Sequence, residues 1–223
     1  MSRIATLVLP GMGVLGGALF LLVGFATQLP GPGDSWTDWI KWSQTHPQAA
    51  LAQVGLWALT PLALLVFGVY LAGISSTSHG WAGWLSRAAL VALGIRAAVE
   101  LAAVAIVAVA ATGAGQGSMA DFGGHLYTAS LLPHAVFLTT LGAAMLIARS
   151  VPRWVGWLTL GVGVVQDLAP VLLVLYLLNL VGFLGPIPNV YGPVWYLSLP
   201  LWPLITGGAL VVVSARKLSP RGL

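Results

Sequence analysis

Six long apolar segments run through the chain, separated by short polar or glycine-rich stretches. They lie at residues 4–27, 49–75, 85–111, 125–148, 154–180 and 193–215. At a rise of about 1.5 Å per residue, a helix of about 20 residues crosses the roughly 30 Å hydrocarbon core of a bilayer. Only 6% of the residues are charged, whereas soluble domains carry about 25%. The sequence therefore predicts an all-α integral membrane protein, a polytopic bundle of about six transmembrane helices.

The rest of the composition removes several classes of protein. The chain has no cysteine, which excludes disulfides, thiolate metal ligands and cysteine nucleophiles. Its net charge is +4, but the few basic residues lie mainly near the ends of the apolar segments and form no basic surface for a nucleic acid. The loops are too short for a soluble domain, so residues 1–223 are predicted to form a single transmembrane helical domain.

Lysine and arginine are distributed unevenly between the two sides of the predicted bundle. If the N-terminus is inside, seven basic residues lie on the inner side and only Lys41 lies on the outer side. The seven are Arg3, Arg87, Arg149, Arg153, Arg216, Lys217 and Arg221. Because cytoplasmic loops are enriched in Lys and Arg, and an even number of spans returns the chain to its starting side, both termini are predicted to be cytoplasmic. The protein is expected in a bacterial inner membrane.

The loop after the first segment contains three tryptophans, Trp36, Trp39 and Trp42, spaced three residues apart. This spacing indicates a short helix at the membrane surface, with its tryptophans at the level of the headgroups and Asp34 as its N-cap. A second interpretation of the same helix is a lid over an outward-facing cavity.

Three ionisable residues interrupt the apolar segments: Arg96 and Glu100 in residues 85–111, and Asp167 in residues 154–180. A charge at the centre of a membrane helix costs about 2.5–3.5 kcal/mol on insertion scales, so such residues usually face the bundle interior and mark a functional site. Arg96 and Glu100 are four residues apart and share a helix face, which predicts an ion pair. The alternative is that the two charges only neutralise each other as a structural staple.

The depth of these residues can be counted along each helix. A rise of about 1.5 Å per residue places Glu100 roughly 22 Å, Asp167 roughly 20 Å and Arg96 roughly 17 Å from the inner edge. His134, which enters from the outer side, lies at roughly 16 Å by the same count. The four residues are therefore predicted at one depth. A substrate cavity at this depth is expected to involve polar and aromatic residues of the neighbouring segments as well, namely Gln53, Trp57, Tyr176, Tyr196 and Trp202.

Two acids and one base at this depth leave a net negative charge in a medium of low dielectric. Burial and like charge both favour a neutral carboxyl, so we expect one proton to be held at neutral pH, by Asp167 or shared with Glu100. Pro170 frees the backbone carbonyl of Gln166, and a kink there opens space beside Asp167. A buried protonated acid can give its proton to a bound molecule or carry protons across the membrane.

No metal or cofactor is expected. His125 and His134 are nine residues apart and lie on opposite sides of a helix, while the other two histidines lie in loops. No lysine lies within an apolar segment, which excludes a retinal Schiff base, and the chain has no Gly-rich phosphate loop of the usual form.

Glu100 and Asp167 lie on separate membrane helices, with tryptophan and tyrosine around them. In this architecture the chain resembles the small integral membrane terpene cyclases of bacteria and fungi, which are all-helical and are thought to protonate an isoprenoid with embedded acidic residues. The resemblance covers most of the chain in outline. It implies an intramembrane enzyme in which Asp167 or Glu100 protonates a lipophilic isoprenoid for cyclisation or isomerisation, while aromatic rings stabilise cationic intermediates.

A small proton-coupled transporter or ligand-binding membrane protein is the alternative function. Residues 59–62 and 168–171 share a leucine–proline pattern, and they lie in the middle helices of two three-helix halves that run in opposite directions. Inverted repeats of this kind are common in transporters. A third option is a structural subunit in which the polar residues only hold helices together.

Overall fold

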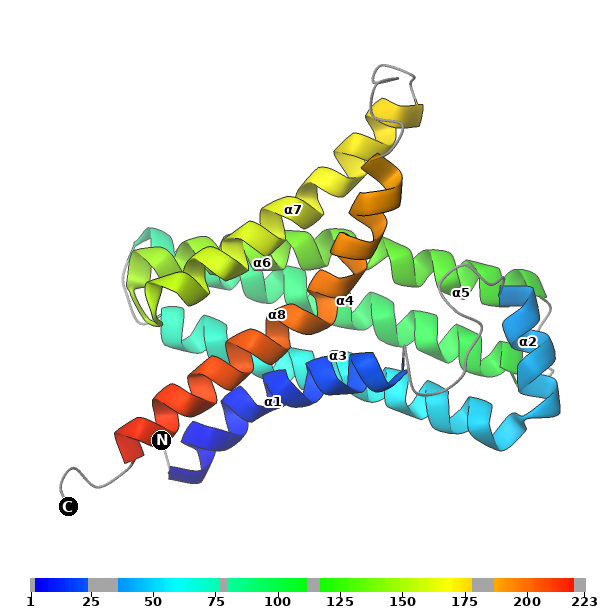
Figure 1. The fold of residues 1–223 in the computed structure, drawn as a ribbon, viewed down its shortest axis with the longest axis horizontal. Helices are drawn as coiled ribbons and strands as arrows, with labels where there is room; N and C mark the ends of the chain where they lie inside the picture. Colours follow the sequence, from blue (N-terminus) through cyan, green and yellow to red (C-terminus); the bar gives the residue numbers. More distant parts are fainter. Residues whose placement is uncertain (1–2, 24–35, 77–79, 112–116, 178–186, 219–223) are drawn as a thin grey trace.

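The computed structural model of the chain is all-helical over the part that it describes, which is residues 3–23, 36–76, 80–111, 117–177 and 187–218. The helices there are α1 (Arg3–Leu21), α2 (Trp36–Thr45), α3 (Pro47–Ser75), α4 (Trp81–Ala111), α5 (Gly117–Ala129), α6 (Leu131–Ala148), α7 (Arg153–Leu177) and α8 (Ile187–Leu218). Figure 1 shows α3, α4 and the α5–α6 pair along the long axis, with α2 across one end. The start of α1 and the end of α8 both lie at the opposite end.

Four helical stretches in the described part are long and apolar enough to cross a membrane. They are Pro47–Ser75, Trp81–Ala110, Asp121–Ala148 and Leu197–Leu218. The apolar stretch of α1 is shorter, Ala5–Leu21. By length and composition these helices define an all-α integral membrane protein, as the sequence predicts.

Two helices begin earlier than the predicted apolar segments. α5 begins at Gly117 rather than near residue 125, and α8 begins at Ile187 rather than near residue 193. The residues added to these helices include glycine and proline, which are tolerated in membrane helices because neighbouring groups satisfy the freed backbone atoms. Glycine and proline are therefore weaker signals of a helix end here than in a soluble protein.

A break between α5 and α6 has a local cause. Pro133 has no N–H to donate to the carbonyl of Ala129, and its ring crowds that carbonyl, so the helical ladder is interrupted around Ser130. At the break, the Ser130 hydroxyl donates a hydrogen bond to the backbone carbonyl of Tyr127 at 2.6 Å. The break sets the direction of α6 and places His134 in its first turn.

Glycines bring α6 and α7 into close contact. A Cβ at Gly142 would lie 2.7 Å from the Cα of Leu160, and a Cβ at Gly163 would lie 2.6 Å from Oγ1 of Thr139. Small residues allow membrane helices to approach in this way. Gly161, in contrast, has open space around its Cβ position. Gly163 therefore lies in the close contact between α6 and α7, whereas Gly161 does not.

We expect Gly142→Ala to lower the free energy of unfolding by about 1–3 kcal/mol, the usual range for an overpacked core. The added methyl group would meet the backbone of Leu160, which cannot move aside unless the two helices separate. Gly161→Ala is the matched control and should change little, because its methyl group meets nothing. Thermal unfolding of the two purified variants in one mild detergent makes the comparison. Equal midpoints would contradict the close approach of α6 and α7.

Candidate functional site

The predicted ion pair between Arg96 and Glu100 is confirmed. Nε of Arg96 lies 3.1 Å from Oε2 of Glu100, and Nη2 lies 3.0 Å from Oε1, so the two planar groups meet in two parallel hydrogen bonds. Both residues are only 2% exposed. They occupy successive turns of one face of α4, which makes the pairing a local property of that helix. Bidentate geometry is the strong form of an arginine–carboxylate pair.

His134 joins the pair from α6. Nη1 of Arg96 donates a hydrogen bond to Nδ1 of His134. A guanidinium group can only donate, so Nδ1 must be the unprotonated nitrogen, and a neutral ring then carries its hydrogen on Nε2. Nε2 of His134 is buried and has no hydrogen-bond partner among the described residues. The three residues form a buried cluster in which the charges are balanced and one N–H donor is left over.

Aromatic rings enclose His134 on one side. The ring of His134 lies 6.1 Å from that of Phe137 and 6.2 Å from that of Trp202, while Phe67 packs 5.8 Å from Trp202. Nε1 of Trp202 donates to Oγ1 of Thr159 on α7, at 3.0 Å. Trp202, predicted as a cavity residue, therefore comes next to His134, but as a fully buried part of the core.

Asp167 is a residue of α7 and lies close to the depth of His134. It packs against a different face of α6 from the one that carries His134. The contacts of Gly142 with Leu160 and of Gly163 with Thr139 give the antiparallel register of α6 and α7. Continued by one turn, that register sets Asp167 opposite Ala135, the neighbour of His134. This agrees with the common depth predicted from the sequence. Thr139, however, is turned by about 140° from His134 around α6 at 100° per residue.

Asp167 has a different environment from Glu100. Oγ1 of Thr139 donates to Oδ2 of Asp167 at 2.6 Å, and the residue is half-buried. Among the described residues, no lysine or arginine forms an ion pair with it. The preceding residue, Gln166, donates from Nε2 to the hydroxyl of Ser198 on α8 at 2.9 Å, while its buried Oε1 has no hydrogen-bond partner among the described residues. A polar group therefore lies between α6, α7 and α8, separate from the cluster at Arg96.

Thr139 and Ser198 are the members of this group that sequence reasoning missed. A hydroxyl in an apolar segment usually bonds a carbonyl of its own helix, as Thr140 and Thr159 do with the residues four positions earlier. Nothing in the local sequence separates Thr139 from Thr140 on α6 or from Thr159 on α7. Only the packing of α7 against α6 gives its hydroxyl a different acceptor.

Gln53 and Trp57 lie nearer the end of the bundle that α2 covers. Nε1 of Trp39 in α2 donates to Oε1 of Gln53 at 3.0 Å, and the rings of Trp39 and Trp57 stack with centroids 6.2 Å apart. The side chain of Trp39 is buried, on the face of α2 that packs against α3. Nε2 of Gln53 is buried without a partner among the described residues.

The structure does not describe the remaining predicted side chains. Pro170, Tyr176 and Tyr196 lie in α7 and α8, but their side chains are not described, and Asp34 lies outside the described residues. Within the part that is described, no three His, Asp or Glu side chains come together in a group that could hold a metal ion.

Comparison with family models, with curated proteins and with solved structures finds no match to this chain. No likeness to a known protein therefore bears on the fold or on the site. What the residues themselves define is a helical protein with four helices that could cross a membrane and two acids within its helices, one paired with a guanidinium group and one bonded to a hydroxyl.

Proposed function

We propose that this protein is an intramembrane enzyme that protonates a lipophilic isoprenoid and cyclises or isomerises it, with Asp167 as the proton donor. The observation that carries the proposal is the difference between the two acids. Glu100 is the counter-ion of Arg96, with which it shares two hydrogen bonds. Asp167 has a hydroxyl as its partner instead of a cation, and in the proposed reaction it is the acid that gives a proton to the substrate. Acids placed in contrasting surroundings are how one site assigns different roles to two carboxyls.

The chemistry needs no oxidant or metal. The O–H bond of Asp167 breaks as its proton forms a C–H bond with one carbon of a double bond, which leaves a carboxylate and a carbocation. A neighbouring double bond then attacks the cation and closes a ring, or the cation stays open. Loss of a proton from an adjacent carbon to the carboxylate forms a new double bond and restores the acid. The product is an isomer of the substrate, and the Thr139 hydroxyl stabilises the transient carboxylate.

The test uses membranes that contain the protein, a linear isoprenoid such as squalene, and deuterium oxide as solvent. Solvent extraction followed by mass spectrometry should find isomers of the added isoprenoid that carry deuterium, because the donated proton exchanges with water. Membranes from the same host without the protein provide the background. Failure to isomerise squalene and a panel of shorter linear isoprenoids would contradict the proposal.

A proton-coupled transporter is the second candidate, and the unpartnered polar atoms favour it. In the part of the chain that the structure describes, Nε2 of Gln53 and Nε2 of His134 are both buried without hydrogen-bond partners, the first close to α2 and the second deeper in the bundle. Groups of this kind can bind a polar solute or water along a path. Uptake of protons by proteoliposomes when a solute is added, without any isomerised lipid, would favour this function over the enzyme.

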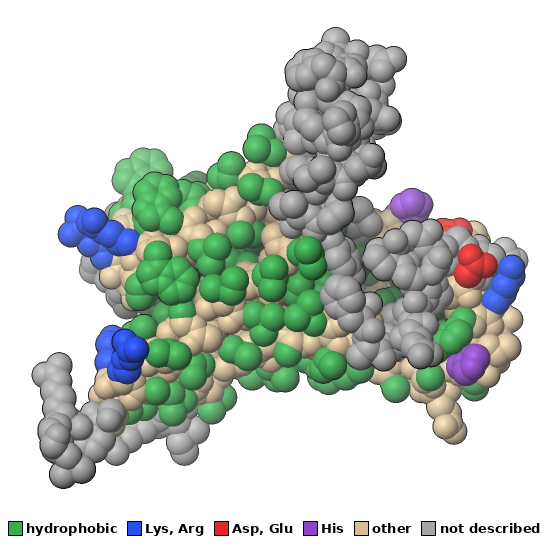
Figure 2. Space-filling model, in the orientation of Figure 1, with side chains coloured by type: hydrophobic (Ala, Val, Ile, Leu, Met, Phe, Trp, Pro, Cys, Tyr) green, Lys and Arg blue, Asp and Glu red, His purple; other side chains and the backbone are tan. Residues whose placement is uncertain are grey.

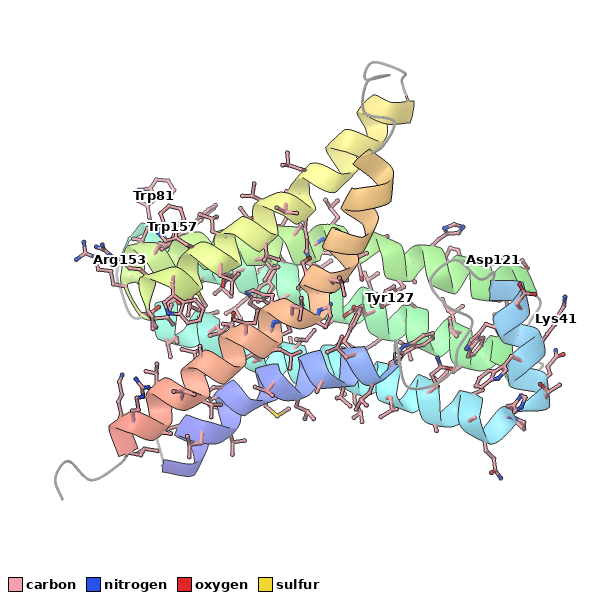
Figure 3. The ribbon with its side chains drawn as sticks, in the orientation of Figure 1. Lys41, Trp81, Asp121, Tyr127, Arg153 and Trp157 are labelled. Atoms are coloured by element: carbon pink, nitrogen blue, oxygen red, sulfur yellow. The ribbon has the colours of Figure 1, made fainter. Side chains whose placement is uncertain are left out.

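We also propose that the chain spans a bacterial inner membrane six times with both termini in the cytoplasm. Support comes from the distribution of charge: Figure 2 shows arginine and lysine at one end of the molecule, and the acidic and histidine side chains gathered at the other. Lys41 lies at that second end, together with Asp121 (Figure 3). The basic end is also where α1 begins and α8 ends. Cytoplasmic segments carry such an excess of basic residues.

We expect reporter fusions at Leu223 and within residues 113–124 to report opposite sides of the membrane. A paired reporter, with one enzyme active only in the cytoplasm and one active only outside it, makes the measurement. Fusions after residue 77, between α3 and α4, should behave like those at Leu223 and serve as the control. The same side for residues 113–124 and Leu223 would contradict the six-span topology.

A further inference from the structure

We propose that the basic end of the molecule carries a binding site for the headgroup of an anionic phospholipid, formed by Trp81, Trp84 and Arg87 at the start of α4. Trp81 is 74% exposed and Trp84 is 60% exposed, with their rings edge to face at 6.1 Å. With Gly80 they line an open hollow of about 470 Å³.

Arg87 supplies the charge. It lies three residues after Trp84, hence on the same face of α4, and it is exposed. Side chains on a helix lean toward its N-terminus, and this spacing favours an approach of the guanidinium group to Trp84 at the edge of the hollow. Arg87 forms no hydrogen bond or ion pair with any described residue. A guanidinium group in this position can bind a phosphate through two parallel hydrogen bonds.

The protein itself does not neutralise this end. The chain has only five acidic residues, and none occurs in residues 39–99 or 122–166, the stretches that contain the starts of α4 and α7. Arg153 and Trp157 of α7 lie at the same end as Trp81 (Figure 3), and both are exposed. The counter-charge must therefore come from outside the chain, and anionic headgroups supply it at this level of a membrane.

The face of α4 beyond Arg87 suits the acyl chains of the same lipid. Val91 and Ile95 are exposed and continue the stripe of Trp84 and Arg87 at helical spacing toward the middle of the membrane. A phosphate at Arg87, a glycerol unit against the tryptophan rings and an acyl chain along this stripe match one phospholipid. This continuity favours a lipid over a free phosphate, which would make no use of the apolar face.

The experiment measures lipid binding to the full-length protein after delipidation in a neutral detergent, by native mass spectrometry with phosphatidylglycerol or phosphatidylcholine. We expect a saturable phosphatidylglycerol adduct whose affinity exceeds that of phosphatidylcholine. Arg87→Gln should weaken the adduct about fivefold, since a basic residue near an anionic surface contributes on that order. Joint replacement of Trp81 and Trp84 by alanine should weaken the adducts of both lipids, whereas Arg87→Lys should keep most of the preference for phosphatidylglycerol.

Arg216→Gln is the matched control, because Arg216 is an exposed arginine in the last turn of α8 with no tryptophan within a turn. It should leave the adduct unchanged. An equal loss for Arg216→Gln and Arg87→Gln would show that only the overall charge matters and would overturn the site. Equal binding of the two lipids would also overturn it, as would displacement of phosphatidylglycerol by inorganic phosphate at the same concentration. All of these variants lie on the surface, and their folding is checked by their thermal unfolding midpoints.

Discussion

Replacing Asp167 with asparagine is expected to leave the fold intact and to reduce the rate of isomerisation by about 10²–10⁴-fold, the typical loss when an acid catalyst is removed. The amide has nearly the shape of the carboxyl group, and its oxygen can still accept the hydrogen bond that Thr139 donates at 2.6 Å. It has no acidic proton to give. The measurement is the rate of deuterium incorporation into the extracted isoprenoid, divided by the amount of folded protein in the membrane.

Asp121→Asn is the matched control for this prediction. Asp121 is an exposed acid on α5, at the end of the molecule opposite Arg153 (Figure 3). The same change of charge there should leave the rate unaltered. Full activity of Asp167→Asn would transfer the role of proton donor to Glu100. If neither Asp167→Asn nor Glu100→Gln changes any measured rate, the polar residues are structural and the enzyme proposal is wrong.

The second large effect is expected at the ion pair. Arg96→Leu should lower the free energy of unfolding by about 3–5 kcal/mol, because it leaves the carboxylate of Glu100 buried without a partner. The same change deprives His134 of the donor to its Nδ1. The double variant with Glu100→Leu removes both charges and should be clearly more stable than the single variant, since an apolar pair can replace a buried ion pair at small cost.

Unfolding of the purified variants in a mild detergent, followed while a denaturing detergent is added, gives the comparison. Arg216→Leu provides the control, because it removes an exposed arginine in the same way and should change stability little. A double variant that is less stable than Arg96→Leu would mean that the cost of a stranded charge is not what makes the single change harmful. It would then be the packing of the two long side chains that stabilises α4 in the bundle.

Much of the site could be predicted because it depends on position along a helix. The pairing of Arg96 with Glu100 follows from a spacing of four residues within one continuous apolar segment, whatever the neighbouring helices do. Depth is almost as local, since a count of residues along each helix predicts His134 and Asp167 near one level. The class of the protein was also predictable, because a bilayer admits few structures for a chain with so little charge.

Contacts around a helix, in contrast, were decided by tertiary packing. The sequence could not show that α6 would turn His134 toward Arg96 and Thr139 toward Asp167, because that depends on which helices pack on its two sides. Trp202 was expected beside a cavity, and its place in the core follows from the crossing of α8 over α6 and α7. Gln53 likewise receives its partner from α2, a separate helix.

The sequence alone determined that this protein is a bundle of apolar helices and which of its charges lie within them, since both properties follow from transfer energies and from the geometry of a single helix. The tertiary structure decided how the two acids in the apolar helices differ. Glu100 has its guanidinium partner on its own helix, whereas the partner of Asp167 comes from α6 through the close contact at Gly163. The physical reason is that the position of a residue around a helix determines its contacts only when a second helix packs against that face.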